Sequence, residues 1–329
     1  MPDWSEILKE LSKTSEELKK EQISVRKSQF DVVRRKYLKL LNQYTGRDTI
    51  LYASNWTQPR DIPSNVIMIN DNDIQGFMTV IHNLKGKNLD LILHTPGGSA
   101  TATEALVSYL RSKFNNIRII IPYAAMSAGT MLACSADEIV MGKNSFIGPT
   151  DPQIIYWTQD RVVVSPAHAV LDQFEMAKKE CKANRENIGV WMPILKGYGP
   201  SLLIECQNAI KLSKQLVETW LKSYMFKKDP NRDEKAKKIA QYLSEHKNFL
   251  SHDRHIGIKK AREMGLLISS LEDDQKFQDL VLSVFHATTH TFSGTPAVKI
   301  IENHLGIAYI DQIRKIFVKE KSTIQNKKQ

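Results

Sequence analysis

Apolar residues in the middle of the chain recur in two alternating periods. Short continuous apolar runs are typical of strands that are buried on both faces of a sheet. Such runs lie at residues 49–53, 65–69 and 89–94 and in the strings IRIIIPY and EIVMG. Residues 71–84, residues 100–114 and the stretch that begins at Ser127 instead show helical spacing. Repeated strand–helix–strand units of this length predict an α/β fold whose parallel sheet has right-handed crossovers.

Helical patterns dominate both ends of the chain. Residues 4–43 read as one helix or as two, and further helical patterns lie at about 200–226, at 232–246 and from 272 onward. The string HDRHIGIKKAREMGLLI predicts a turn, a short helix and the last strand of the chain. The tail KEKSTIQNKKQ is expected to fray. The first helix carries an apolar stripe that needs a partner, either the body of the protein or another subunit. The stripe consists of Trp4, Ile7, Leu8 and Leu11.

The charge pattern bears on the class of partner. The net charge is +10, from 46 Lys and Arg against 36 Asp and Glu. Basic residues alternate with acidic ones along predicted helices, as in SEELKKE and RDEKAKK, which is typical of solvated helix faces. This pattern argues against a nucleic-acid partner. The first apolar stripe is flanked by mixed charges rather than by a basic face, so peripheral membrane contact is not favoured either.

The cysteines and the first residues bear on location. Cys134, Cys181 and Cys206 form no CxxC pair, which is typical of a reducing compartment. The N-terminus lacks the basic and apolar regions of a signal peptide, and no run approaches the roughly 18 apolar residues of a membrane span. The sequence therefore predicts a cytoplasmic protein without a transmembrane segment.

Two glycine-containing turns, HTPGG and AMSAGT, each follow an apolar run and open a helix. Both should lie at the carboxyl edge of the sheet, where reactive groups gather in open α/β folds. Without side chains at Gly97 and Gly98, backbone N–H groups can approach a ligand closely. Ser127 would lie at a helix N-terminus, where free N–H groups favour developing negative charge. A serine that attacks a carbonyl needs this arrangement, although capping and tight turns alone also explain both strings.

The known motifs for such turns are absent. The string AMSAG departs from the GxSxG of the usual nucleophile elbow. Neither turn contains GxGxxG or GxxxxGK[ST], so a phosphate-binding loop is the weaker reading.

HTPGG, AMSAGT and the run ADEIVMG…IGPTDPQ together resemble the serine dehydrogenase proteinase family. That family is related to signal peptide peptidase A-type serine proteases and is similar to the Clp protease and crotonase fold. The resemblance covers roughly residues 31–270 and implies repeated β-β-α units around a mainly parallel sheet. It implies a division into an N-terminal helical segment, a Clp/crotonase-like protease domain and a C-terminal helical segment. These span residues 1–45, 46–270 and 271–329.

The resemblance also implies an activity and a site. The expected function is a serine peptidase that acts through an acyl-enzyme on Ser127. Backbone N–H groups of Gly97 or Gly98, and of Ala128, would form the oxyanion hole. Relatives with this fold form rings or stacked oligomers, so a homo-oligomer that cleaves peptide or protein substrates is expected.

The general base is open at this stage. The Clp base is a histidine, and Thr150 in GPTDP stands at its position. Signal peptide peptidase A-type enzymes use a lysine instead, for which Lys196 is the preferred match; Lys178 and Lys179 are closer in separation but look exposed. His252 is the second choice for the base.

The remaining members of the site are assigned by the same resemblance. The orienting carboxylate falls on Asp253. Asp151 either holds a turn or lines the substrate groove with Thr150.

Metal and cofactor chemistry is not expected. His286 and His290 have the i, i+4 spacing of a metal pair, but Ala287 stands in place of the zincin glutamate, so packing or surface roles are favoured. No cofactor is predicted. Two alternatives to a peptidase stay open: a non-catalytic oligomeric scaffold or sensor of the same fold, and a crotonase-type acyl-CoA enzyme, which lacks its expected glutamate pair here.

Overall fold

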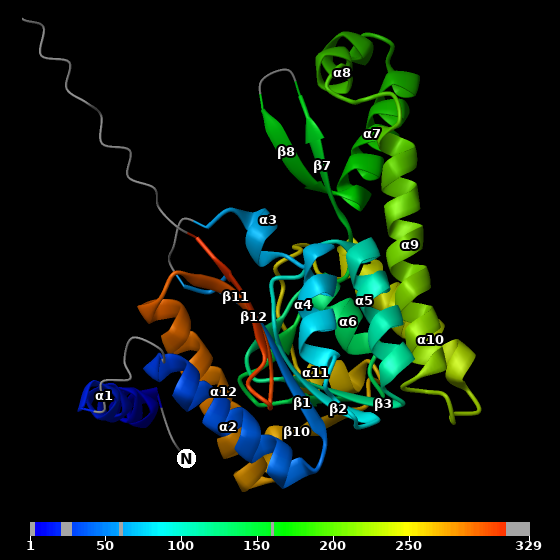
Figure 1. Cartoon of the computed structure of the whole chain (residues 1–329). Coiled ribbons are helices and arrows are strands. Elements are labelled where there is room, and N and C mark those ends of the chain that lie inside the picture. The colour runs from blue at the N-terminus through cyan, green and yellow to red at the C-terminus, as the bar shows by residue number, and fades with distance from the viewer. Residues whose placement is uncertain (1–3, 21–27, 59–61, 159–160, 314–329) are drawn as a thin grey trace, which may run out of the picture.

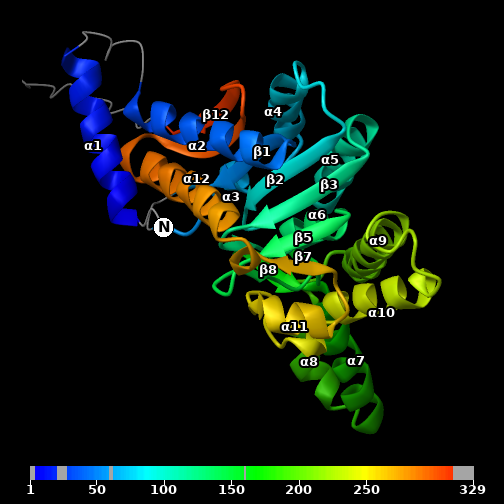
Figure 2. The same cartoon turned by 90° about the horizontal axis from the view of Figure 1, so that it is seen from below.

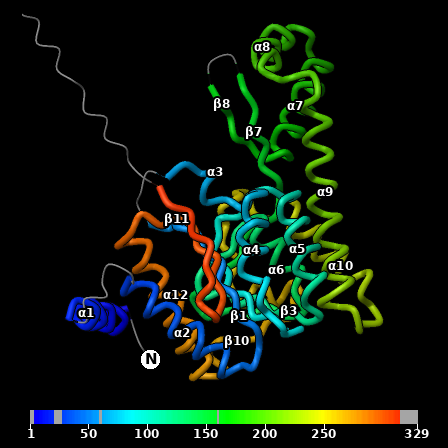
Figure 3. The backbone as a smooth tube through the Cα atoms, in the orientation of Figure 1, coloured from blue at the N-terminus to red at the C-terminus, as the bar shows by residue number. Residues whose placement is uncertain are grey.

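A seven-stranded sheet forms the centre of the computed structural model, which describes residues 4–20, 28–58, 62–158 and 161–313. The strand order is β10-β5-β3-β2-β1-β11-β12. Five neighbouring strands run parallel: β10 (Ile268–Ser270), β5 (Glu138–Met141), β3 (Asn116–Ile121), β2 (Asn88–His94) and β1 (Asp48–Ser54). β11 (Ala297–Asn303) runs antiparallel to both of its neighbours, β1 and β12 (Ala308–Gln312). Figure 3 shows the red end of the chain returning beside β1.

Helices cover both faces of this sheet (Figures 1 and 2). Each face of the sheet has its own hydrophobic core, because alternate residues of a strand point to opposite faces. One core contains residues of α4 (Asn72–Ile81), α5 (Ala100–Lys113), α6 (Ala128–Cys134), α9 (Leu202–Ser223), α10 (Arg232–Ser244) and α11 (Ile258–Glu263). The other contains residues of α1 (Trp4–Lys20), α2 (Gln29–Thr45) and α12 (Gln275–Gly294).

A second, small sheet lies beyond the carboxyl ends of the parallel strands. Its order is β4 (Ala124–Ala125), β6 (Phe146–Ile147) and β9 (Ile256–Gly257). β4 is tied to the main sheet because Thr95, directly after β2, pairs with Ala125. This small sheet carries the residues of the site described below.

An arm projects from the body in Figure 1. It comprises the hairpin of β7 (Gln153–Trp157) and β8 (Val162–Pro166), α7 (Ala167–Ala183), α8 (Asn187–Leu195) and the N-terminal part of α9. The arm has its own small core, which includes Ala167, Val170, Leu202 and Cys206. Short turns complete the fold: α3 (Ser64–Ile67), η1 (His246–Asn248) and η2 (Leu271–Asp273).

The structure confirms the α/β class and the mainly parallel sheet. The prediction of a strand at residues 65–69 is wrong, because Pro63 opens the short helix α3 and only Ile69 makes a ladder contact, with Gly98. The C-terminal helix α12 is present, but β11 and β12 follow it, so β10 is not the last strand. The predicted three-part division of the chain stays a prediction.

The N-terminal stripe packs mainly on the body of the protein. Ile7 and Leu11 are buried against α2 and α12, whereas Trp4 and Leu8 remain 42% and 49% exposed. The predicted fraying tail at 319–329 lies outside the described residues. Among the helices that the structure describes, none is both long and apolar enough to cross a bilayer.

Candidate active site

Ser127 lies at a strained turn between β4 and α6. Its φ of 50° and ψ of −116° lie outside the regions that side-chain-bearing residues usually adopt, and Leu250 is the other described non-glycine residue with positive φ. Such strain persists only where surrounding structure holds it, and it is common at active sites. Within the described part of the chain, no hydrogen bond ties down the Ser127 hydroxyl. The oxygen is therefore free to act at the N-terminus of a buried helix.

Gly97 packs directly against this turn. A Cβ atom at Gly97 would lie 2.5 Å from Met126 O, 2.7 Å from Ser127 Cβ and 2.9 Å from Ala128 N. The φ of Gly97 is +96°, a conformation that also favours glycine. Glycine at this position thus lets the two turns that the sequence singled out meet at one place.

The N–H groups of Gly98 and Ala128 differ from that of Gly97 in their hydrogen bonding. The Gly97 N–H donates to Thr95 Oγ1 at 3.2 Å. No described partner accepts from the N–H of Gly98 or of Ala128, the first residue of α6. Unpaired N–H groups at a helix N-terminus and a glycine turn suit an oxyanion better than a neutral oxygen.

His94 fastens the HTPGG turn to the strand that precedes Ser127. Its Nδ1 lies 3.2 Å from Ala124 O, and the Thr95 N–H donates to the same oxygen at 3.1 Å. Burial lowers the pKa of His94 to about 4, although the hydrogen bond to Ala124 opposes that shift. His94 is therefore a neutral structural histidine near pH 7.

The register of the small sheet brings distant segments to one end. Ala125 faces Ile147 in parallel, and Ile147 faces Ile256 in antiparallel pairing. Ser127 follows Ala125 by two residues. Asp151 follows Ile147 by four residues, and His252 precedes Ile256 by four. Ser127, Asp151 and His252 therefore lie on segments that extend from the same end of the small sheet.

Asp151 is fully buried between two imidazoles. His252 Nδ1 lies 2.8 Å from Asp151 Oδ1, and His246 Nδ1 lies 2.8 Å from Asp151 Oδ2. Each histidine is about one-fifth exposed. A buried carboxylate that binds Nδ1 fixes the tautomer of a neutral imidazole and leaves Nε2 to accept a proton. This is the geometry of an oriented general base.

The neighbouring Thr150 anchors the segment that carries Asp151. Its N–H donates to Leu243 O at 2.9 Å, and Ser213 Oγ donates to Thr150 O at 2.7 Å. The Thr150 hydroxyl itself is buried, with no partner among the described residues. α9 and α10 thereby hold the backbone next to Asp151.

The lysines that the sequence favoured lie elsewhere. Lys196 is exposed directly after α8, and Figure 1 shows α8 at the end of the arm, well separated from α6. Lys178 and Lys179 are exposed on α7, and Lys178 pairs with Glu175 at 2.8 Å. The structure thus does not bring these lysines together with Ser127, because the arm carries them away from the body.

Asp253 and His246 also differ from the sequence-based expectations. Asp253 is exposed and its N–H donates to Ser251 Oγ, so the carboxylate bound to His252 is that of Asp151. Sequence reasoning did not single out His246. It belongs to no motif, and only the folding of η1 against Asp151 reveals it.

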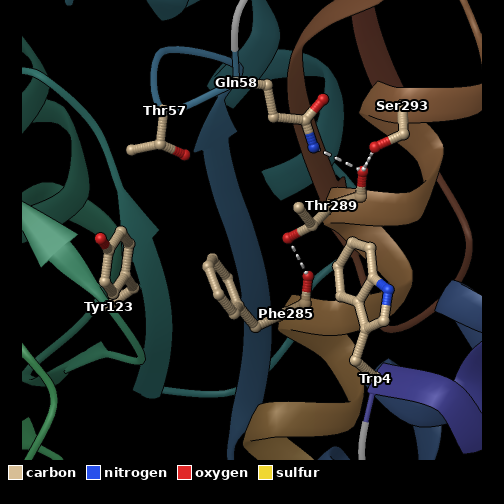
Figure 4. Close-up of a pocket in the computed structure, with 7 residues that line it drawn as sticks. All are labelled: Trp4, Thr57, Gln58, Tyr123, Phe285, Thr289 and Ser293. Atoms are coloured by element: carbon tan, nitrogen blue, oxygen red, sulfur yellow. Dashed lines mark hydrogen bonds between the residues drawn. The ribbon is translucent and has the colours of Figure 1, made fainter.

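A cavity of about 600 Å³ lies against α12. Figure 4 shows Phe285 and Trp4 beside it, with Gln58 Nε2 donating to Thr289 O at 3.0 Å. Neither Ser127 nor Asp151 lines it. The size of this cavity does not by itself make it the substrate site.

The HATTH histidines pack against the N-terminal helix. The rings of His290 and Trp4 stack with centroids 3.7 Å apart, and His290 Nε2 lies 3.1 Å from Trp4 O. Burial lowers the pKa of His290. Within the described ranges, no group of three or more His, Cys, Asp or Glu side chains is arranged so that it could hold a metal ion.

A model of ClpP-like SDH-type serine proteinases matches residues 62–285. The chain belongs to this family. The matched segment contains both glycine turns, Ser127, Asp151 and both histidines that bind Asp151.

Two relatives of this ClpP-like SDH-type proteinase come from Methanocaldococcus jannaschii, and both are uncharacterized proteins. MJ1495 is 33% identical over 183 residues, which is 55% of this chain and 52% of that protein. MJ0137 is 31% identical over 182 residues, which is 55% of this chain and 54% of that protein. The chain spans about half the length of the curated relatives it matches.

Solved structures give a weaker likeness. A membrane-bound stomatin-specific protease, 1510-N, matches with a TM-score of 0.36 and 16% identity over 61% of this chain and 75% of that chain. A ClpP1 variant from Listeria monocytogenes matches with a TM-score of 0.35 and 10% identity over 72% of this chain and 98% of that chain.

Proposed function

We propose that this chain is a serine peptidase that cleaves peptide bonds through an acyl-enzyme on Ser127. The single observation that carries the proposal is the positive-φ turn at Ser127, which packs against Gly97 at the N-terminus of α6. Membership of a serine proteinase family supports the same chemistry. That its substrates are peptides or proteins is part of the same proposal.

The proposed base is His252, oriented by Asp151. Lys196 is set aside because it is exposed at the far end of the arm. His252 is preferred to His246 because β9 carries its segment alongside β6, next to the strand that leads to Ser127. His246 would steady the other oxygen of Asp151.

The reaction follows from these roles. Ser127 Oγ attacks the peptide carbonyl while His252 Nε2 takes its proton. The N–H groups of Gly98 and Ala128 donate to the oxyanion of the tetrahedral intermediate, and Gly97 gives them room. The imidazolium then protonates the leaving amine, and the acyl-enzyme forms. Water activated by His252 hydrolyses the ester and restores the Ser127 hydroxyl.

A fluorophosphonate probe tests the nucleophile without knowledge of the substrate. We expect one adduct per chain in intact-mass spectra, mapped to Ser127 by peptide analysis, and no adduct on a Ser127→Ala variant. The reason is that only a deprotonated, oxyanion-supported serine displaces fluoride readily. Ser12→Ala, at an exposed serine of α1, is the control and should keep the adduct. An unreactive folded protein at all pH values from 6 to 9 would favour the scaffold alternative.

The arm supports the proposal of a homo-oligomer. On one face of its hairpin, Ile155 pairs with Val164 and Trp157 with Val162, and all four side chains are exposed. A two-stranded hairpin with such a face is marginal alone, and exposed apolar patches commonly mark protein contacts. We propose that a second copy of the chain covers this face.

The oligomer prediction concerns molecular mass. A Trp157→Glu, Val164→Glu variant should fall to a lower mass in light scattering, because two carboxylates would be buried in the subunit contact. Met78→Glu, at an exposed apolar site on α4, is the matched control and should leave the mass unchanged. An unaltered protein that is already monomeric at high micromolar concentration would refute the arm contact.

A further inference from the structure

The backbone of Ile69 holds the glycine turn at Gly97 and Gly98. Its N–H donates to Gly97 O at 2.8 Å, and its carbonyl accepts from the Ser99 N–H at 2.9 Å. The contact is close, because a Cβ at Gly98 would lie 2.4 Å from Ile69 O and 2.5 Å from Ile69 N. The direction of the Gly98 N–H therefore depends on where Ile69 lies.

The residues on both sides of Ile69 are fixed by one buried cation. Lys299, on β11, places Nζ 2.8 Å from Met68 O and 2.7 Å from Asp73 Oδ1. The other oxygen of Asp73 accepts from the Asn70 N–H at 3.0 Å. One ion pair thus fixes the backbone before and after Ile69.

This ion pair is secluded from water. The side chains of Lys299 and Asp73 are each 1% exposed, and Tyr52 donates its hydroxyl to Asp73 Oδ2 at 2.6 Å. Buried charges that are fully paired and hydrogen-bonded adopt a single geometry, whereas loss of one partner leaves the other charge uncompensated. Removing the ammonium would leave Met68 O without this donor and the buried Asp73 carboxylate without its cation.

Lys299 lies on β11, outside residues 62–285 that match the family model. Its side chain points to the α4 face of the sheet, as does Ile301, whereas Ile300 and Glu302 point to the α2 and α12 face. The strand between β1 and β12 therefore reaches the backbone next to Ile69 through one side chain.

We propose that Lys299 is a positioning residue of the oxyanion site. Through Met68 and Asp73 it fixes Ile69, and Ile69 in turn aims the Gly98 N–H at the developing negative charge. Lys299 touches no substrate. This inference rests on the proposed peptidase function, because it deepens the account of the same site.

The test compares Lys299→Met with Glu302→Gln. The first variant keeps the length of the side chain and removes the ammonium. The second disrupts another buried ion pair of the same strand, in which Arg34 Nε donates to Glu302 Oε2 at 2.5 Å on the opposite face. Both variants should lose thermal stability. Only Lys299→Met should disturb the glycine turn.

Fluorophosphonate kinetics give the first readout. For Lys299→Met we expect the limiting rate, kinact, to fall about 10- to 100-fold, less than the loss of a whole oxyanion donor, with KI unchanged. For Glu302→Gln both constants should stay unchanged. Equal kinact in Lys299→Met and the unaltered protein, or equal losses in both variants, would overturn the proposal.

Amide hydrogen exchange gives a second readout that needs no activity. In Lys299→Met, the amides of Ile69 and Ser99 should exchange faster, whereas in Glu302→Gln they should not. If the unaltered protein takes no probe but this exchange pattern appears, the peptidase proposal fails while the link from Lys299 to the turn holds. Unchanged exchange at Ile69 and Ser99 in Lys299→Met would overturn the link itself.

Discussion

A His252→Ala variant is expected to react with a fluorophosphonate about 10²- to 10⁴-fold more slowly than the unaltered protein. The hydroxyl of Ser127 would then have no group to accept its proton. Asp151→Asn should produce a loss of similar size, because an amide can no longer hold Nδ1–H and the tautomer of His252 becomes wrong. The second-order rate constant of labelling, taken from timed quenches, measures both.

The companion variants separate the candidate bases. The double variant His252→Ala, Asp151→Asn should label only slightly more slowly than His252→Ala alone, because the aspartate acts through the imidazole. Lys196→Ala should label at the unaltered rate. His246→Ala should lose less than His252→Ala, because it removes only a support of Asp151. Normal labelling of His252→Ala together with loss in Lys196→Ala would instead establish a serine–lysine dyad.

The second large effect concerns Gly97. A methyl group at this position would lie 2.5 Å from Met126 O and 2.9 Å from Ala128 N, so the backbone of the nucleophile turn must shift. Gly97→Ala should therefore reduce labelling of Ser127 by about 10²- to 10³-fold, the usual cost of a lost oxyanion donor. Labelling per folded molecule, with folding checked by thermal unfolding, gives this value.

Gly46→Ala is the matched control for Gly97→Ala. Gly46 also has positive φ, at +65°, but a Cβ there would meet nothing within 4 Å. Its replacement should lower the free energy of unfolding by about 1–2 kcal/mol, the cost of left-handed backbone for alanine, and leave labelling unchanged. If Gly97→Ala labels as fast as Gly46→Ala, the close approach of the two turns has no part in catalysis.

The sequence predicted the turns of the candidate site that are local in the chain. Both glycine turns follow strands and open helices, so continuous apolar runs and two short strings were enough to locate the turns at Gly97 and Ser127. β11 also has a readable signal, the apolar run in AVKIIEN, which the helical reading of the C-terminal segment overlooked. These features depend only on neighbouring residues.

The other half of the site depends on pairings between distant segments. Asp151 and His252 meet because β6 pairs with β9, two strands of only two residues each. Such short strands carry no periodicity. The placement of Lys196 has a related cause: Lys196 lies just ahead of the long helix α9 in the sequence, and the arm carries that part of the chain outward. Orientation of a projecting element is set by packing, which a single sequence does not display.

The pairing of β11 with β1 bears on the order in which parts of the protein can fold during synthesis. Ile50 faces Asn303 across this pairing, so the two strands cannot meet until nearly the whole of the sheet has left the ribosome. Ser127 and His252 emerge earlier than Lys299. A nascent chain would thus contain Ser127 and His252 before Lys299 can secure the glycine turn. On the proposal that Lys299 positions the glycine turn, the oxyanion site would therefore be completed only after β11 has paired with β1.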